Sequence, residues 1–208
     1  MKKIFLLCSV LAALPVFAQD YYEIQDYGLR KNSTRVEFYG GMVLPKDNWK
    51  AKVGSNNVEL GNTGWTAGIG LARSVIPYFG LGVDLNYTQF GDGKKVSNTY
   101  YRTGLATGLV TARIDLFPHS ATRLYIPAGI GVGHTFIRKK TGNAHVTTDG
   151  TDLAQMIGAG LEFDLDESLI FGVEGRYYLL DAPDDVRETF HKRHFHHLLV
   201  MLKLGCRF

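Results

Sequence analysis

Residues 198–208 read LLVMLKLGCRF, and the alternation in this stretch decides the fold. Taken with a period of two, one face is wholly apolar and consists of Leu198, Val200, Leu202, Leu204, Cys206 and Phe208. The other face carries Lys203 and Arg207, which a helix would mix into the apolar set, whereas a strand keeps its two faces apart. Such an apolar face invites aggregation in water, but in a closed membrane barrel it meets lipid while the polar face lines the lumen. The stretch therefore predicts a strand of a transmembrane β-barrel.

The first eighteen residues have the three parts of a secretory signal peptide. Lys2 and Lys3 form the charged region, residues 4–13 form an apolar run, and Val16-Phe17-Ala18 is a small-residue cleavage site. The predicted boundaries are 1–18 for the signal peptide, 19–32 for a periplasmic lead-in, and 33–208 for the barrel. Removing the signal takes away two of the 23 lysines and arginines and none of the 20 acids, which leaves a net charge of about +1. That balance indicates neither nucleic-acid binding nor a polybasic membrane arm.

The composition after the signal points to a single β-rich domain. Hydrophobic residues make up 45% of the chain, with 24 glycines, 11 tyrosines and 12 phenylalanines, and no later run approaches the ~20 apolar residues of a spanning helix. Cys206 is the single cysteine beyond the signal, so a disulfide framework is not expected. Two classes remain for an exported chain of this kind: a soluble β protein and an outer-membrane barrel.

Seven further segments alternate as the final one does and bring the expected strand number to eight. The expected strands are 34–44, 63–73, 79–89, 100–117, 123–138, 151–165, 169–180 and 198–208. The connections between them are long at 46–62, 90–99, 139–150 and 181–193, and short at 74–78, 118–122 and 166–168. Strict alternation of short and long connections, with an even strand number, is typical of bacterial outer-membrane barrels, whose turns are periplasmic and whose loops are extracellular.

Within the central span of each expected strand, no acidic or basic residue lies on the apolar face, and the strand charges lie on the opposite face. The set comprises Arg35, Glu37, Asp84, Arg113, Asp115, Glu162, Glu174, Arg176, Lys203 and Arg207. A lysine or arginine that faces lipid at the bilayer midplane costs ~2–4 kcal/mol, so this placement favours a lumen position for all ten. Five bases balance five acids, and an eight-stranded barrel is just wide enough for side chains to fill. We therefore expect a neutralised charge network and a closed interior in preference to a pore.

With this layout the chain resembles the small eight-stranded outer-membrane barrels of the protein A and protein X type. The resemblance implies an all-β fold, an eight-stranded antiparallel up-and-down transmembrane β-barrel with a side-chain-filled lumen, in the cell outer membrane. It implies a monomer surrounded by outer-membrane lipid and lipopolysaccharide. Phe208 is similar to the terminal signal that this class presents to the barrel-assembly machinery. Pro127 departs from a regular strand and predicts a β-bulge, because proline cannot donate to a ladder.

Four histidines crowd the start of the last strand: His191, His194, His196 and His197. His194 and His196 share a face in an extended strand, so with His191 or a nearby acid they could hold zinc or copper. Without a dedicated third ligand, a polar rim is the favoured interpretation, and no metal or cofactor is predicted.

Basic residues also gather in the expected loops, namely Arg138, Lys139, Lys140, Lys192 and Arg193. Basic side chains at the outer rim suit the phosphates of lipopolysaccharide, and solvated loop charge is the alternative.

Catalysis is not expected from the polar residues. Acyl hydrolysis needs a serine, a histidine and an acid within hydrogen-bond reach, and no serine here shares a strand face with a histidine. The predicted function is a non-enzymatic one in envelope integrity, with loops that touch external ligands or lipopolysaccharide. A narrow channel and a lipid A hydrolase are the alternatives.

Aromatic residues lie toward both ends of the expected strands. Those toward the loops are Trp65, Tyr87, Tyr101, Phe136 and Tyr177, and those toward the turns are Tyr78, Phe117, Phe163 and Phe208. This distribution predicts two aromatic girdles at the membrane interfaces, with the core of a soluble sandwich as the alternative.

Overall fold

The computed structural model describes residues 33–46, 50–53, 56–93, 99–118, 120, 122–141, 144–182, 184–190 and 194–208. The predicted signal peptide and lead-in, residues 1–32, lie outside the described residues.

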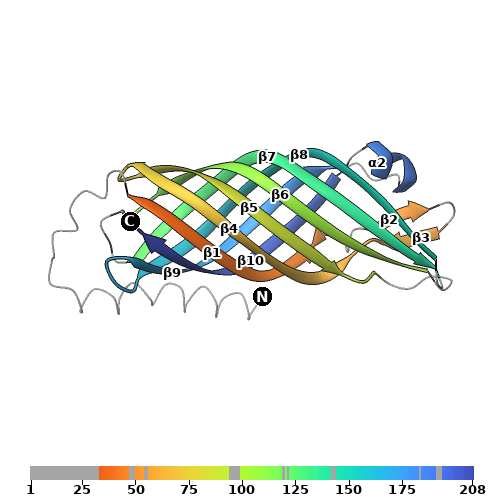
Figure 1. Cartoon of the computed structure of the whole chain (residues 1–208), viewed down its shortest axis with the longest axis horizontal. Helices are drawn as coiled ribbons and strands as arrows, with labels where there is room; N and C mark the ends of the chain where they lie inside the picture. Colours follow the sequence, from red (N-terminus) through yellow and green to blue (C-terminus); the bar gives the residue numbers. More distant parts are fainter. Residues whose placement is uncertain are drawn as a thin grey trace, which may run out of the picture.

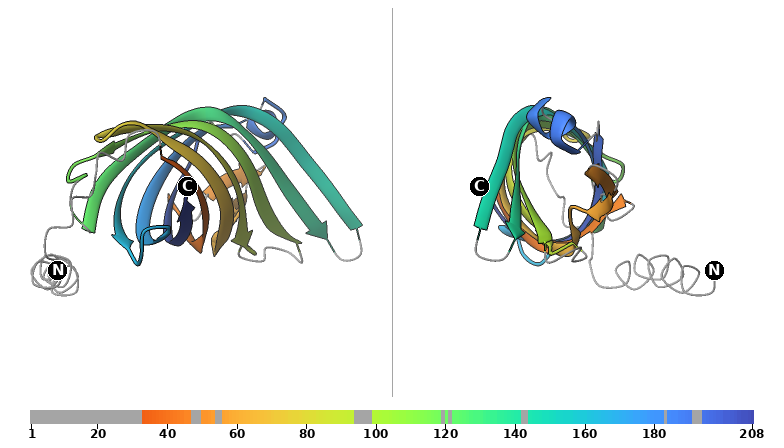
Figure 2. Two further views of the ribbon diagram at one scale, coloured as in Figure 1. Left: turned by 60° about the vertical axis from the view of Figure 1, so that its left-hand side comes forward. Right: turned by 90° about the vertical axis from the view of Figure 1, so that its right-hand side faces the viewer.

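Eight antiparallel strands close into a barrel (Figures 1 and 2). They are β1 (Thr34–Pro45), β4 (Asn62–Ile76), β5 (Phe79–Gly91), β6 (Thr99–Asp115), β7 (Thr122–Thr141), β8 (Ala144–Asp164), β9 (Leu169–Asp181) and β10 (His194–Arg207). Neighbours in sequence pair with one another, and β1 pairs with β10 from Arg35↔Arg207 to Pro45↔His197, which closes the ring. The predicted eight-stranded antiparallel barrel is confirmed.

Alternation along the strands separates an apolar outer surface from a buried interior. On β10, Leu202 is 57% exposed, whereas its neighbours Met201 and Lys203 are buried. Phe38 on β1 and Val110 on β6 are exposed in the same way. Period two therefore sets the direction of each side chain around the ring. Within the described part of the chain, no helix is long and apolar enough to cross a membrane.

The expected long loops contain structure that was not predicted. The segment 46–62 holds a small hairpin of β2 (Lys50–Val53) and β3 (Asn56–Glu59), and the segment 181–193 holds the helix α2 (Asp184–Phe190). Figure 1 places the hairpin and the helix at the same end of the barrel. The helix is short, begins with two acids that suit its N-terminal dipole, and buries Val186 and Phe190 at a spacing of four residues.

The third expected long loop, 139–150, is mostly strand. β7 extends to Thr141 and β8 begins at Ala144, because β-branched Val146, Thr147 and Thr148 favour extended backbone even where apolar alternation stops. The two strands pair out to Thr141↔Ala144, and β9 begins to pair with β8 only at Ala154. The β7–β8 hairpin therefore extends beyond its neighbour β9 at the long-loop end, as Figure 2 shows.

The bulge predicted at Pro127 is absent. Tyr125 pairs with Gly160 and Ala128 pairs with Ile157, so the register is the same on both sides of the proline. The pairing with β8 is only interrupted at Ile126 and Pro127, and the Pro127 ring packs near Gly158. Register shifts occur instead at the two ends of the β4–β5 pair.

An apolar core fills the barrel at the long-loop end, and we call it the apolar cap. Its members are Val43, Val58, Leu60, Phe90, Tyr101, Leu105, Ile137, Leu180, Ala182, Val186, Phe190, Phe195 and Leu199. Tyr101 was predicted in an outer girdle, and that prediction is wrong, because this residue shares the inward parity of Leu105. It is 3% exposed and packs edge-on against Phe190 at 5.7 Å. The outer girdle residues Trp65, Tyr87, Tyr78 and Phe117 are exposed.

Candidate functional site

Charged side chains fill the barrel between the apolar cap and the short turns. Twelve of the described residues form this charge network: Arg35, Glu37, Asp84, Arg113, Asp115, Arg123, Glu162, Asp164, Glu174, Arg176, Lys203 and Arg207. Each side chain is at most 11% exposed. All ten charges that period two assigned to the lumen lie in it. Arg123 and Asp164 share the same inward parity but were not among the ten. Six bases therefore face six acids.

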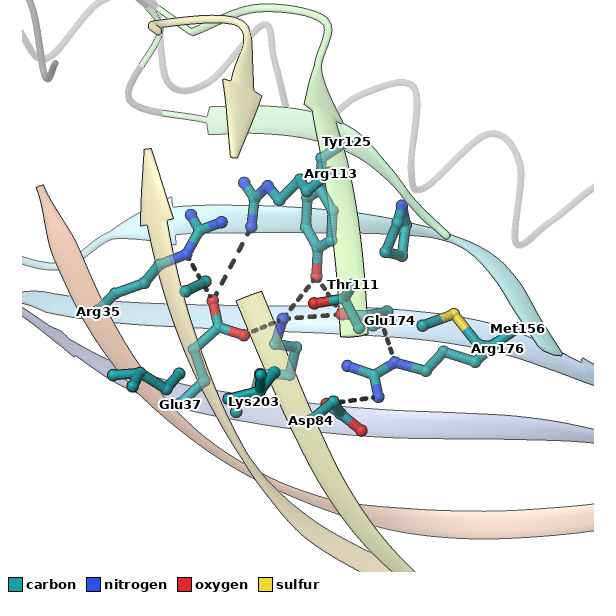
Figure 3. Close-up of a pocket in the computed structure, with 15 residues that line it drawn as sticks. Arg35, Glu37, Asp84, Thr111, Arg113, Tyr125, Met156, Glu174, Arg176 and Lys203 are labelled. Carbon is teal, nitrogen blue, oxygen red and sulfur yellow. Dashed lines mark hydrogen bonds and ion pairs between the residues drawn. The ribbon is translucent and has the colours of Figure 1, made fainter. Parts of the chain in front are cut away.

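Lys203 on β10 lies at the centre of the network (Figure 3). Its Nζ is 2.7 Å from Glu37 Oε2 on β1, 2.8 Å from Glu174 Oε2 on β9, and 3.1 Å from the hydroxyl of Tyr125 on β7. Tyr125 in turn donates to Glu174. One ammonium group thus links β10 to both of its neighbours and to a strand across the barrel.

Arg113 on β6 and Glu162 on β8 form a two-pronged pair over the intervening strand β7. Arg113 Nη2 donates to Glu162 Oε2 at 2.6 Å and Nη1 donates to Oε1, which is the bidentate geometry of strong charge-assisted hydrogen bonds. Arg113 Nε also donates to Asp115 at 2.8 Å, and its guanidinium lies 3.6 Å from the centroid of the Tyr125 ring. This arginine is therefore held on three sides.

A third group lies nearer the apolar cap. Arg176 Nη1 donates to Asp84 at 2.9 Å and its Nε donates to Glu174, while the hydroxyl of Tyr39 donates to Asp84 at 2.6 Å. The Arg176 guanidinium lies 4.6 Å above the Tyr39 ring. Figure 3 shows how Arg176 spans the space between Glu174 and Asp84.

The fourth group closes the network at the short-turn end. Asp164 on β8 accepts from Arg123 at 2.7 Å and from Arg207 at 3.0 Å. Arg123 also approaches Glu162 at 3.3 Å, so this group is continuous with the others.

Two glycines make room for tyrosine rings that lie over the neighbouring strand on the inner wall. A methyl group at Gly160 would overlap the ring of Tyr125, and one at Gly68 would overlap the ring of Tyr39. The glycine on the inner wall therefore decides whether each ring can lie against the sheet and reach its carboxylate. These two tyrosines lie on the inward parity of their strands, which is the sequence signal that could have placed them in the network.

The space left between these side chains is small. A cavity of about 30 Å³ is lined by charged residues that include Glu37, Asp84, Glu174, Arg176 and Lys203. This volume holds roughly one or two water molecules. Tight filling keeps water away from these charges, so each one needs an opposite charge beside it, because an uncompensated buried ion costs about 3–5 kcal/mol.

The histidines at the start of β10 divide between the two faces of the strand. His194 is exposed with its Nδ1 2.8 Å from Asp181, and the ring of His196 lies beside that of Tyr177 at 5.9 Å. His197 is buried on the opposite face and stacks on Tyr178 at 5.0 Å. His191 lies outside the described residues. Within the residues that the structure describes, no three or more His, Cys, Asp or Glu side chains are grouped for a metal ion.

Three of the five basic residues expected in the loops belong to the described part of the chain. Arg138 and Lys139 are exposed near the end of β7, and Lys140 Nζ lies 5.7 Å from the centroid of the Tyr100 ring. Lys192 and Arg193 lie outside the described residues.

A family model for the outer membrane protein beta-barrel domain matches residues 4–196. The chain belongs to this outer membrane β-barrel family. It is accordingly a protein of the outer membrane, in which short turns are periplasmic and long loops extracellular. The apolar cap then lies at the extracellular end. No curated protein matches the chain.

Solved outer-membrane barrels share the fold of this family member. Neisserial surface protein A has a TM-score of 0.55 and 12% identity, over 84% of this chain and 97% of that one. Ail, the attachment invasion locus protein of Yersinia pestis, has a TM-score of 0.53 and 15% identity, over 86% and 99%. OprG from Pseudomonas aeruginosa has a TM-score of 0.54 and 14% identity, over 87% and 98%.

Proposed function

We propose that this outer-membrane barrel is a non-enzymatic, non-conducting structural protein that supports envelope integrity and contacts lipopolysaccharide at its extracellular rim. The observation that carries the proposal is the filled interior. An ion that entered from outside would meet the apolar cap first and the charge network next. Passage would require the ion to displace buried side chains and to separate paired charges.

The energetics of the interior favour a closed barrel over a narrow channel. Glu162 has arginines on several strands as partners, and Glu37 and Glu174 share Lys203. Separating one such charge from its partners costs about 3–5 kcal/mol, so an open path through the network is costly. The cavity of about 30 Å³ has room for water but not for a hydrated ion.

The placement of the described serines supports a role without acyl hydrolysis. Ser33 and Ser74 lie 3.4 Å apart at the short-turn end, and Ser168 donates to Asp166 in a short turn. These serines belong to the periplasmic side, whereas the acyl chains of lipopolysaccharide are in the outer leaflet. As a nucleophile, any of these described serines would be at the wrong side of the membrane for lipid A.

Phe208 is the residue through which we propose that the barrel-assembly machinery recognises the chain. Its amide donates to the Thr34 carbonyl at 2.8 Å, which fixes the backbone beside β1, while its ring is 79% exposed. We expect Phe208→Ala to lower the assembled fraction of the protein in cells, as judged by heat-modifiable migration, while the purified variant still folds in detergent. Equal assembly of the variant and the unmodified chain would contradict this role.

Planar-bilayer recording tests the proposed function. The purified protein is expected to give no steady unit conductance, with an open porin reconstituted in the same way as the positive control. Steady unit conductance would refute the closed barrel and favour the narrow channel. Mass spectrometry of lipid A from cells with and without the protein is expected to show the same acyl chains, and loss of one would favour the hydrolase.

A further inference from the structure

Two arginines oppose each other on the outer face of the barrel near its extracellular end. Arg102 on β6 pairs directly with Arg138 on β7, and the next outward pair is Tyr100 with Lys140. Like charges directly opposite each other in a sheet are destabilising. Arg102 is half-exposed and contacts Asp92 at 2.7 Å, whereas Arg138 has no ion pair with any residue that the structure describes. We call Arg102, Arg138 and Lys140 the basic cluster.

A row of aromatic rings runs around the outer surface of the barrel beside the basic cluster, and we call it the aromatic row. The ring centroids of Trp65 and Tyr87 are 5.6 Å apart, those of Tyr87 and Phe136 are 6.0 Å apart, and those of Phe136 and His134 are 6.1 Å apart. A methyl group at Gly104 would overlap Phe136, so the Phe136 ring covers this glycine on the outer surface. The row thus spans β4 to β7 on the outside of the sheet.

Apolar, aromatic and basic side chains follow one another along the outward face of β7. Ile130 and Val132 are more than half exposed and belong to the apolar surface, His134 and Phe136 belong to the aromatic row, and Arg138 follows. Outward neighbours are two residues apart, which is about 7 Å along a strand. The outer leaflet has the same order of chemistry, from acyl chains through the headgroup level that aromatic belts occupy to phosphates.

We propose that the basic cluster and the aromatic row form a binding site for the phosphorylated diglucosamine headgroup of lipid A. The site lies at the extracellular end, where the outer leaflet consists of lipopolysaccharide rather than phospholipid. A phosphate between Arg102 and Arg138 relieves their repulsion and accepts charge-assisted hydrogen bonds from both guanidinium groups. The sugar rings then lie over the aromatic row.

Other charged groups on the same face leave the site cationic. Asp92 is engaged by Arg102, and Asp149 lies 3.6 Å from His134 at the level of the aromatic row. His145 on β8 is exposed and pairs directly with Lys140. Three permanent cations therefore face two carboxylates, with two histidines beside them.

The test measures lipid binding by native mass spectrometry of the full barrel in detergent. Bis-phosphorylated lipid A is expected to bind the unmodified protein at least tenfold more tightly than lipid A without phosphates or phosphatidylglycerol. Arg138→Gln is expected to weaken binding of bis-phosphorylated lipid A by about tenfold, the loss expected for one charge-assisted hydrogen-bonded contact. Arg73→Gln is the matched control, because Arg73 is an exposed arginine near the opposite end of the barrel. The affinity of this variant for bis-phosphorylated lipid A is expected to stay within twofold of that of the unmodified protein.

Each outcome decides the site. Equal binding by Arg138→Gln and the unmodified protein would overturn it, as would an equal loss with Arg73→Gln or equal affinity for phosphatidylglycerol. Displacement of lipid A by millimolar inorganic phosphate would also overturn the proposal, because the cluster would then be a site for free phosphate. Unchanged heat-modifiable migration confirms that each variant is folded.

This inference rests on the lipopolysaccharide contact in the proposed function, and the two can fail separately. If lipid A still binds the Arg138→Gln barrel in full, the contact stands and this site is refuted. If lipid A binds neither form, the contact itself is refuted. Planar-bilayer conductance tests the closed interior independently of both results.

Discussion

Lys203→Met is the substitution that tests the charge network most sharply. It removes the ammonium group between Glu37 and Glu174 and leaves an apolar side chain of similar length. An uncompensated buried charge costs about 3–5 kcal/mol. Glu37 keeps Arg35 at 3.0 Å, and Glu174 keeps Arg176 and Tyr125. Because partners remain for both acids, we expect a loss of about 3 kcal/mol, at the lower end of that range.

A second substitution separates charge imbalance from lost packing. Lys203→Met combined with Glu37→Gln restores equal numbers of acids and bases, so we expect the double variant to regain at least about 1 kcal/mol relative to Lys203→Met. Arg102→Met is the control, since its exposed pair with Asp92 contributes less than about 1 kcal/mol.

The assay is the free energy of unfolding in urea, measured by tryptophan fluorescence for the barrel in phospholipid vesicles. A loss below about 1 kcal/mol for Lys203→Met would refute the argument that buried partners depend on this cation. A double variant as unstable as the sum of the two single variants would show that neutrality of the interior is irrelevant.

Two further predictions concern a packing contact and a turn. Gly160→Ala is expected to displace the Tyr125 ring and lower the free energy of unfolding by about 1–3 kcal/mol. Gly175→Ala is the control and is expected to be tolerated, because its added methyl group would meet nothing closer than 3.9 Å. Equal effects of the two substitutions in urea unfolding would contradict the packing of the Tyr125 ring over Gly160. The amides of Leu169 and Ser168 donate to Asp166 and lower the pKa of its carboxyl group below 3.8, so its contribution to stability is complete at neutral pH and is lost as the pH falls through that lowered value. An NMR titration of the Asp166 carboxyl carbon checks the direction, and a midpoint above 3.8 would be incompatible with these hydrogen bonds.

Period two was enough to predict the direction of side chains in the strands. Leu202 and Lys203 are adjacent, yet one is exposed and the other is buried, as their parity requires. The pairing of the charges was not predictable in the same way. Arg176 and Asp84 are 92 residues apart, and their contact depends on the curvature of the closed barrel rather than on local pattern.

The extracellular end is the part of the fold that the sequence pattern predicts least well. The seven residues of α2 carry only two buried apolar positions, Val186 and Phe190, so the helical period is too brief to recognise. Leu105 and Ile137 lie in expected strands, but nothing in their alternation shows that the interior changes from charged to apolar at their level. That change depends on which loop residues fold back over the barrel mouth.

The central claim is that hydrocarbon side chains cover the outside of this barrel, while its inside is filled by the apolar cap at one end and by the charge network below it. NMR of methyl-labelled protein in lipid nanodiscs tests it directly, through magnetisation transfer from lipid acyl chains to individual methyl groups. We predict strong transfer to Leu202, Val200 and Val173, which are exposed, and none to Leu199 and Met201, which are buried. Transfer to Leu199 and Met201 with none to Leu202 would contradict the account.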